Sequence, residues 1–478
     1  MQIKSTQIVR LLLWGLFTIS IIRLLTVSKS FSPLGLHVTA LTAISAFVIS
    51  LFSEKKGSKL RFNFLSSSIL VSISILIVNF FDYWQYSLGF SDNIHGIDAV
   101  GYQVINKASL SALCIYISFL VGGTYGNKIF PERKSNNPIS VPTKYLEILM
   151  LISLLVFYFS TDNYFFHGGY GEIMNSVGIS PLSQISLTLI QSFQLSISVI
   201  IIYRQRSCNF REYLRCYSPI YYVTLLIFYY LIISAGERGF LIYTGVVFLL
   251  TYYVINHKAI KTRTMIILGV MAVLMLNVLG VLRALDGDLS GEKVKQAYAI
   301  NEERNSDNIF FSSTSELSDV VQTYHVIYAF VDQYTVLYGI GIADQCLGII
   351  PGLRFFLYPL LGIDQTQFSS TALSTRILDK EVGMGTTCVA DIYLNVGLIG
   401  SLLVFFFIGI FLKRMDRSLY YSSPNFVVMI LAIQYVSYGI YIGRSTLLIP
   451  INTCAYAILI VFICSIVSKK KHASIVNY

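Results

Sequence analysis

The stretch GTTCVADIYLNVGLIGSLLVFFFIGIFLKR, residues 385–414, decides the fold. Between residues 388 and 412 the only charged side chain is Asp391, and Lys413 and Arg414 follow at once. A helix needs about 20 apolar residues to cross the hydrocarbon core of a bilayer. The stretch therefore predicts a membrane-spanning helix whose basic end lies in the cytoplasm.

The rest of the 478-residue chain has the same character. It is 55% hydrophobic and 13% charged, whereas soluble domains carry about 25% charged residues. Twelve stretches are long and apolar enough to span: 8–26, 33–53, 62–81, 108–126, 145–161, 183–203, 218–236, 239–257, 265–285, 388–412, 425–442 and 446–467. The sequence predicts an all-α polytopic membrane protein, a single transmembrane domain over residues 1–478 with the lipid bilayer as its main partner.

The basic residues follow membrane topology. Of the 35 Lys and Arg residues, 23 lie in the N-terminal segment, in alternate loops and in the tail at Lys469–Lys471. Because basic loops stay on the cytoplasmic side, both termini are expected in the cytoplasm. The net charge of +10 is explained in this way, and no basic stretch with interleaved aromatics predicts nucleic-acid binding. The N-terminus shows no cleavable signal pattern.

The opposite face carries the segments 82–107, 162–182 and 286–387, and the last forms a large loop. Apolar residues recur in it at Val321, Tyr324, Tyr328, Val331 and Tyr338, which predicts an amphipathic helix against the membrane or the bundle. Residues 346–361 are apolar but short and contain two prolines. They predict an interfacial or re-entrant element, with two further spans as the alternative.

Motifs for metal or cofactor chemistry do not stand out. The seven cysteines include no C-x-x-C pair and no His/Cys cluster with metal spacing. Cys346 and Cys388 could meet outside the membrane, but their spacing favours ordinary small apolar residues over a disulfide. Walker A, G-x-S-x-G and H-E-x-x-H sequences are also missing. We expect no metal and no cofactor.

Five arginines on the predicted outer face run against the positive-inside bias. They are Arg238, Arg283, Arg354, Arg376 and Arg444. Each could simply extend to the lipid headgroups, but Arg354 lies among apolar residues and needs an anionic partner. Arginine binds phosphate oxygens through two parallel hydrogen bonds. The set therefore predicts a site for a lipid-linked diphosphate.

Candidate bases are fewer. Glu237 adjoins Arg238, Asp391 begins the tenth predicted span, and His325 falls on the polar side of the amphipathic helix. A structural role is the alternative for each of the three.

Three motifs resemble those of the Wzy-type O-antigen polymerases, the oligosaccharide repeat-unit polymerases. Residues 385–400 are similar to the family's pattern of a small-residue turn, an acidic residue, a Tyr and then Asn-x-Gly-x-x-Gly, with Asp391 where the family has Glu. SAGERG (234–239) is similar to its Gly-x-Arg hairpin, and IIPGLR (349–354) to its Ile-Pro-Arg element with two residues inserted. The resemblance covers residues 230–450.

The resemblance implies a bacterial inner-membrane enzyme with a glycosyltransferase-C-like helical architecture and a periplasmic loop at 286–387. Its reaction would transfer a glycan from undecaprenyl diphosphate to a hydroxyl of a new lipid-linked repeat unit, without a nucleotide sugar. Arg238, Arg283 and Arg354 would bind the diphosphates with support from Arg376 and Arg444. His325 and Tyr393 would bind substrate, and a chain-length regulator protein would be a partner.

Two other classes remain open. An O-antigen ligase uses the same donor and also has about twelve spans and a large external loop. A flippase of lipid-linked oligosaccharide has many spans and cationic residues, but usually shows internal repeats and no long external loop.

Overall fold

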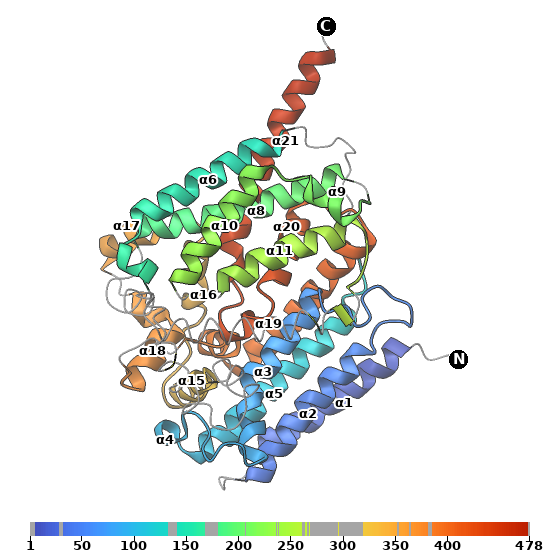
Figure 1. Ribbon diagram of the computed structural model, residues 1–478. Coiled ribbons are helices and arrows are strands. Elements are labelled where there is room, and N and C mark those ends of the chain that lie inside the picture. The colour runs from blue at the N-terminus through green and yellow to red at the C-terminus, as the bar shows by residue number, and fades with distance from the viewer. Residues whose placement is uncertain are drawn as a thin grey trace. The chain divides into compact units, whose positions relative to one another are not determined.

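A computed structural model describes residues 5–27, 32–131, 141–167, 180–205, 207–235, 237, 239–260, 263–264, 267, 295, 319–350, 353–362, 365–380 and 385–476. All regular elements of these residues are helices (Figure 1). Eight of the helices are long and apolar enough to cross a membrane, and three shorter apolar helices accompany them. The chain is therefore a multi-pass α-helical membrane protein.

Together these helices account for eleven of the twelve predicted spans. The remaining one, 265–285, lies outside the described residues except for residue 267. The prediction of an all-α polytopic fold is confirmed, although several boundaries differ. The third span begins at Ser67 rather than 62 and the fourth at Tyr102 rather than 108.

The chain divides into two compact units. Unit 1 comprises Met1–Ile129, Phe310–Arg417 and Gly439–Ile449. Its long helices are α1 (Ser5–Thr26), α2 (Pro33–Leu51), α3 (Ser67–Ser87), α5 (Tyr102–Tyr125) and the part of α19 (Cys388–Tyr421) that ends at Arg417. Its short elements are α4 (Ile97–Val100), α15 (Val321–Gln333), α16 (Ile340–Leu347), α17 (Leu353–Leu361), η2 (Gln365–Phe368), α18 (Ser370–Ile377) and η3 (Ile442–Arg444).

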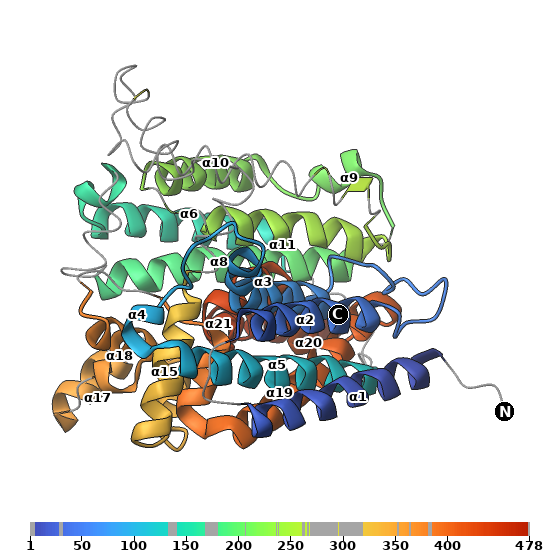
Figure 2. The same ribbon diagram turned by 90° about the horizontal axis from the view of Figure 1, so that it is seen from below.

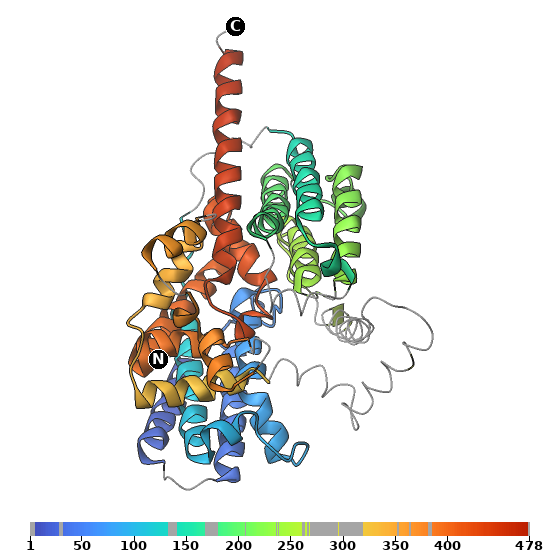
Figure 3. The same cartoon turned by 90° about the vertical axis from the view of Figure 1, so that its left-hand side faces the viewer.

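Unit 2 comprises Phe130–Ile309, Ser418–Tyr438 and Pro450–Tyr478. Its helices are α6 (Thr143–Ser160), η1 (Asn163–His167), α8 (Pro181–Arg204), α9 (Phe210–Leu214), α10 (Pro219–Ser234), α11 (Gly239–Ile255), α20 (Phe426–Ser437) and most of α21 (Ile449–Val476). Figure 3 shows α6, α8, α10 and α11 side by side, in teal to yellow-green. Gln194 of α8 donates to Tyr221 of α10 (3.2 Å) and to the Thr244 carbonyl of α11 (2.9 Å), so a buried amide joins three helices.

In unit 1, α5 and α19 cross at two glycines. A Cβ on Gly122 would lie 2.0 Å from the Phe406 carbonyl oxygen, and one on Gly409 would lie 2.1 Å from the Phe119 oxygen. Small residues of this kind let backbones approach closely in membranes, where packing rather than hydrophobicity drives association. The Ser118 hydroxyl donates to the Leu402 carbonyl (2.8 Å) beside the crossing.

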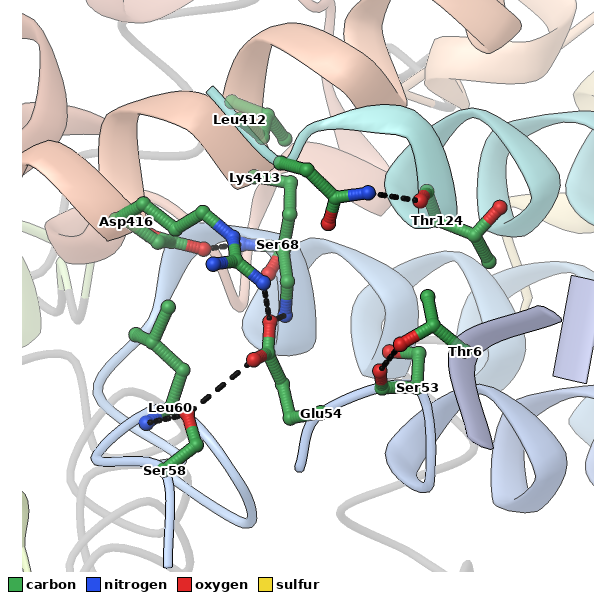
Figure 4. Close-up of polar contacts among 12 residues, drawn as sticks. Thr6, Ser53, Glu54, Ser58, Leu60, Ser68, Thr124, Leu412, Lys413 and Asp416 are labelled. Carbon is green, nitrogen blue, oxygen red and sulfur yellow. Dashed lines mark hydrogen bonds and ion pairs between the residues drawn. The ribbon is translucent and has the colours of Figure 1, made fainter. Parts of the chain in front are cut away.

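A buried charge network closes the basic end of unit 1 (Figure 4). Glu54 lies 3.0 Å from the Lys413 ammonium and 2.8 Å from the Arg417 guanidinium. Burial acts to raise the pKa of Glu54, but the charges of these two cations outweigh it and lower the pKa. Asp416 is fully buried and accepts from the backbone N–H groups of Ser67 (2.8 Å) and Ser68 (3.0 Å). It thereby satisfies the unpaired donors at the start of α3.

The helix α19 is broken at Gly397, which adopts φ +65° and ψ −168°. The break turns two carbonyls away from the helix ladder. The Leu394 oxygen accepts from the Leu337 N–H (2.8 Å), and the Asn395 oxygen accepts from the Gly339 N–H (3.0 Å). A Cβ in this conformation would be strained, so the glycine is needed to attach the 334–339 connector to α19.

The described part of the large loop is folded. The helix predicted in this region is confirmed as α15, which packs on α3, α4 and α5 (Figure 2), but its polar Thr323 and His325 are buried too, so the predicted polar face is not confirmed. It ends at Gln333, so its expected extension to Tyr338 was wrong; Tyr338 has a positive φ of 48°. Where the structure describes the 346–361 region, its helices are too short to span a membrane, because α16 and α17 have only 8 and 9 residues and a helix rises about 1.5 Å per residue. Cys346 and Cys388 are free thiols.

The α5–α19 crossing gives a stability prediction. Gly122→Ala should lower the free energy of unfolding by on the order of 2 kcal/mol, because the added methyl overlaps a backbone oxygen that cannot move alone. Its neighbour is the matched control. A Cβ on Gly123 would meet only the Gly409 oxygen at 4.0 Å, so Gly123→Ala should be neutral or slightly stabilising. The midpoint of thermal unfolding in detergent measures both, and equal shifts in the two variants would rule out the close crossing.

Candidate functional site

Asp391 lies in the first turn of α19, as predicted, and is 2% exposed. The Thr387 hydroxyl caps this turn by accepting from the Ala390 N–H at 2.9 Å. The Asp391 carboxylate accepts from the Gln345 amide of α16 (2.8 Å) and from the Ser370 hydroxyl of α18 (3.3 Å). Two short helices of the large loop thus orient one carboxylate.

Asn395, one turn further along α19, fastens α16 to the same place. Its amide donates to the Asp391 carbonyl (2.8 Å), and its side-chain oxygen accepts from the Ile342 N–H (3.2 Å). A Cβ on Gly341 would come within 2.9 Å of the Asn395 side chain. The Asn-x-Gly part of the sequence motif therefore acts by holding the large loop against α19.

Tyr393 faces α15 in an aromatic cluster and is 7% exposed. Its ring stacks on Tyr328 (5.3 Å between centroids, 24° between planes) and meets Tyr324 edge-on at 5.7 Å. The Tyr324 hydroxyl donates to Ser111 of α5 at 2.8 Å. These contacts fix α15 between α5 and the start of α19.

The predicted position of His325 on the polar side of α15 was wrong, because its ring is fully buried. Its Nδ1 lies 2.9 Å from the His95 carbonyl oxygen, and its Nε2 lies 2.6 Å from the Tyr83 hydroxyl. Burial lowers the pKa of His325 to about 4, so the ring is neutral near pH 7. Since a carbonyl can only accept, Nδ1 carries the proton and Nε2 accepts from Tyr83.

Beside it lies an arrangement that the sequence did not reveal. The fully buried Asp82, near the end of α3, accepts from the His95 ring Nδ1 (2.7 Å) and from the His95 backbone N–H (3.1 Å). The other ring nitrogen lies 3.3 Å from Asp319, just before α15. The hydrogen bond to Asp82 raises the pKa of His95; burial opposes it, and the charges of Asp82 and Asp319 add to it. The His95 imidazole lies between two carboxylates and ties α15 to the end of α3.

The signal for this triad is faint in sequence. Asp82 closes an apolar span and His95 follows 13 residues later, which matches no local motif, and Asp319 is more than 200 residues away. The ring nitrogens face different carboxylates, so the three groups do not converge. In the described part of the chain, no group of three or more His, Cys, Asp or Glu side chains could hold a metal ion.

The structure locates only part of the predicted arginine set. Arg238 and Arg283 lie outside the described residues, and for Arg354 only the backbone, in α17, is described. Arg376 is exposed in the last turn of α18. Arg444 is partly buried in η3, where its backbone N–H donates to the Tyr441 carbonyl (3.0 Å). The shared diphosphate site therefore stays a prediction.

Glu237, the other candidate base, belongs to unit 2. Its carboxylate accepts from the Gly239 N–H at 2.8 Å, at the start of α11. The side chain is partly buried, and this contact gives it a helix-capping role.

The family described as O-antigen polysaccharide polymerase Wzy matches residues 8–473, nearly the whole chain. No curated protein and no solved structure matches.

The raised pKa of His95 predicts a pH dependence. A raised folded pKa means that its contribution to stability is complete below the ordinary histidine pKa of about 6.5 and is lost as pH rises through the folded value. Because the His95 side chain is 38% exposed, the effect should be on the order of 1 kcal/mol. Above about pH 6.5 His325 is neutral in both the folded and the unfolded state, so it adds no pH dependence to the stability. The unfolding midpoint should therefore fall with rising pH in the wild type and fall less in His95→Gln.

The control for that measurement is His257→Asn, which changes an exposed ring at φ +47°, a conformation that Asn tolerates. Its pH profile should follow the wild type. Parallel pH profiles of the wild type and His95→Gln would contradict a stabilising interaction of His95 with Asp82 and Asp319.

Proposed function

The chain belongs to the O-antigen polysaccharide polymerase Wzy family, and from this membership we propose that it polymerises undecaprenyl-diphosphate-linked repeat units at the periplasmic face of the bacterial inner membrane. The match over residues 8–473 carries the proposal. The basic loops support an orientation with both termini in the cytoplasm. In this orientation the large loop 286–387 is periplasmic.

The proposed glycan transfer needs cations that stabilise the leaving diphosphate, rather than a nucleotide or a metal cofactor. The acceptor hydroxyl oxygen attacks the anomeric carbon of the donor, the bond from that carbon to the diphosphate breaks, and the lipid diphosphate leaves with the bonding electrons. Arginines can stabilise the charge that grows on the diphosphate, and one lost donor of this kind typically costs about 10²–10³ in rate. We assign diphosphate binding to Arg238, Arg283 and Arg354, with Arg376 and Arg444 in support.

The hydroxyl proton needs an acceptor. Asp391 is the best candidate in unit 1, because the Gln345 amide and the Ser370 hydroxyl hold its carboxylate from two elements of the large loop. Glu237, adjacent to Arg238, is the second candidate. Tyr393 and His325 act by positioning in this proposal: their contacts fix α15, which would form one wall of the glycan site.

Experiments can test two alternative functions, ligase and flippase, and one proposed partner protein. A ligase would pass the finished glycan to a lipid A–core acceptor, and a flippase would move the lipid-linked unit without joining it. A chain-length regulator protein is proposed as a partner, and deleting it should change the length distribution of the ladder without stopping polymerisation.

The main test is the lipopolysaccharide ladder of a deletion strain complemented with variants. With a polymerase removed, one repeat unit stays attached and the ladder disappears, whereas loss of a ligase removes all attached glycan. Arg238→Ala and Arg354→Ala should each leave single-unit product, and the Lys variants should restore little, because Lys cannot bind two phosphate oxygens in the same way.

The matched control is Arg215→Ala, in a predicted cytoplasmic loop, which should give a full ladder. Membrane levels of every variant are measured by immunoblot. A full ladder from both Arg238→Ala and Arg354→Ala would remove the arginine assignment.

Asp391 is tested by an isosteric change. Asp391→Asn removes the charge while leaving oxygen and nitrogen atoms for the Gln345 and Ser370 contacts, so the protein should reach the membrane at normal levels. As base catalysis contributes about 10²–10⁴ in rate, polymer should fall to a trace. A wild-type ladder from Asp391→Asn would assign the carboxylate to structure alone.

A further inference from the structure

A partly open cavity with both polar and apolar lining residues lies between α1, α2 and α5 in unit 1, at the end where α1 stops and α2 begins. Its volume is about 210 Å³, and it is lined by Arg23, Thr26, Val27, Ser32, Gly35, Thr39, Asn106, Ser109 and Leu110. A water molecule in the liquid takes up about 30 Å³, so the space suits a polar group of phosphate size with some water. The described lining residues include one cation, hydroxyl and amide groups, and no acidic side chain.

Among the described residues of this lining Arg23 is the only charged one, and its side chain reaches across to α2. Its Nη2 donates to the Gly35 carbonyl (3.1 Å) and to the buried Thr39 hydroxyl (3.3 Å). Among the described residues its Nε and Nη1 have no hydrogen-bond partner, and no carboxylate pairs with it. A partly buried guanidinium in the last turn of a membrane-spanning helix, held in place with unused donors, can bind an anion.

The second helix of the cavity adds to the positive potential. The N-terminus of α2 follows Ser32, whose hydroxyl caps the Gly35 N–H at 3.1 Å. Helix N-termini carry a partial positive charge and favour anions. Ser32 and Gly35 line the cavity, so this charge and that of Arg23 act on the same space.

The surroundings point to a lipid rather than to a soluble anion. In their most apolar windows α1 is only 17% buried and α2 28%. Leu25 (79% exposed), Leu34 (70%) and Val38 (39%) stand next in sequence to cavity residues. A hydrocarbon chain could lie along these side chains while its head occupies the cavity.

We propose that this cavity binds the phosphate head of a membrane lipid through Arg23. Two sources share that chemistry: a polyprenyl diphosphate, as in the substrates of the proposed reaction, and an ordinary anionic phospholipid. The inference rests on the proposed function only for the first source, because phosphate binding by the cavity does not depend on catalysis.

The test uses the purified full-length protein in detergent and native mass spectrometry. The probes are a short-chain polyprenyl diphosphate, phosphatidylglycerol and inorganic phosphate. The wild type should retain at least one of the two lipids, and Arg23→Gln should bind it at least about tenfold more weakly, because it loses charge-assisted hydrogen bonds. Preference for the diphosphate identifies a substrate subsite, and preference for phosphatidylglycerol a structural lipid.

Two further variants keep the result interpretable. Arg10→Gln is the control on the same helix: Arg10 is already bound to the Thr124 carbonyl (2.9 Å) and lies 3.8 Å over the Tyr125 ring, so lipid retention should not change. Asn106→Asp keeps Arg23 but places a carboxylate in the cavity, and it should abolish binding even if Arg23→Gln folds poorly.

Equal lipid retention by wild type, Arg23→Gln and Asn106→Asp would overturn the proposal, as would binding of inorganic phosphate alone. Failure of the proposed function gives a different result. If the variants bind lipid as expected but deletion of this chain leaves the glycan ladder unchanged, the lipid-binding proposal stands and only the polymerase function is refuted.

Discussion

The buried carboxylate of Asp416 is the contact on which unit 1 depends. It replaces water at two backbone donors of α3 and at the Ser67 hydroxyl, from a position 349 residues away in sequence. An isolated buried carboxylate would be costly, but hydrogen bonds satisfy this one, and the nearby Lys413 also pairs with Glu54. Lys413 and Arg417, which help to predict a cytoplasmic loop, therefore also join α19 to the end of α2 through Glu54, while Asp416 joins α19 to α3.

From that end toward Asp391, further contacts hold α19 and its neighbours in place. The close crossing with α5 at Gly122 and Gly409 prevents it from sliding, and the break at Gly397 frees the carbonyls that hold the 334–339 connector. Asn395 and Asp391 then fasten α16 and α18. A series of backbone-scale contacts thus converts a membrane-spanning helix into the anchor of a folded loop, and loops positioned by rigid elements are where binding and catalysis usually reside.

Hydropathy predicted the helices well because lipid imposes one requirement on every span, namely about 20 apolar residues with internally satisfied backbone. It predicted their ends poorly. The start of α5 at Tyr102 contains Asn106 and Lys107, which read as loop residues, yet Asn106 is buried by its neighbours. The polar face assigned to His325 failed for a related reason. Helical spacing shows which residues share a face, but not that Tyr83 and the His95 carbonyl would meet that face.

The candidate site was predictable only where chemistry and local sequence coincide. Asp391 could be singled out because a lone carboxylate in an apolar run is conspicuous and needs donors, and the structure supplies them. The Asp82–His95–Asp319 triad could not be predicted from sequence, since its members come from three segments that only the folded large loop brings together. Arg23 does not stand out in sequence either, because a single basic residue near a helix end is ordinary. Its significance lies in what surrounds it: a cavity, the N-terminus of α2 and no carboxylate. The charge of one residue does not show what it binds, whereas the balance of charge around a cavity indicates which ligand the cavity can hold.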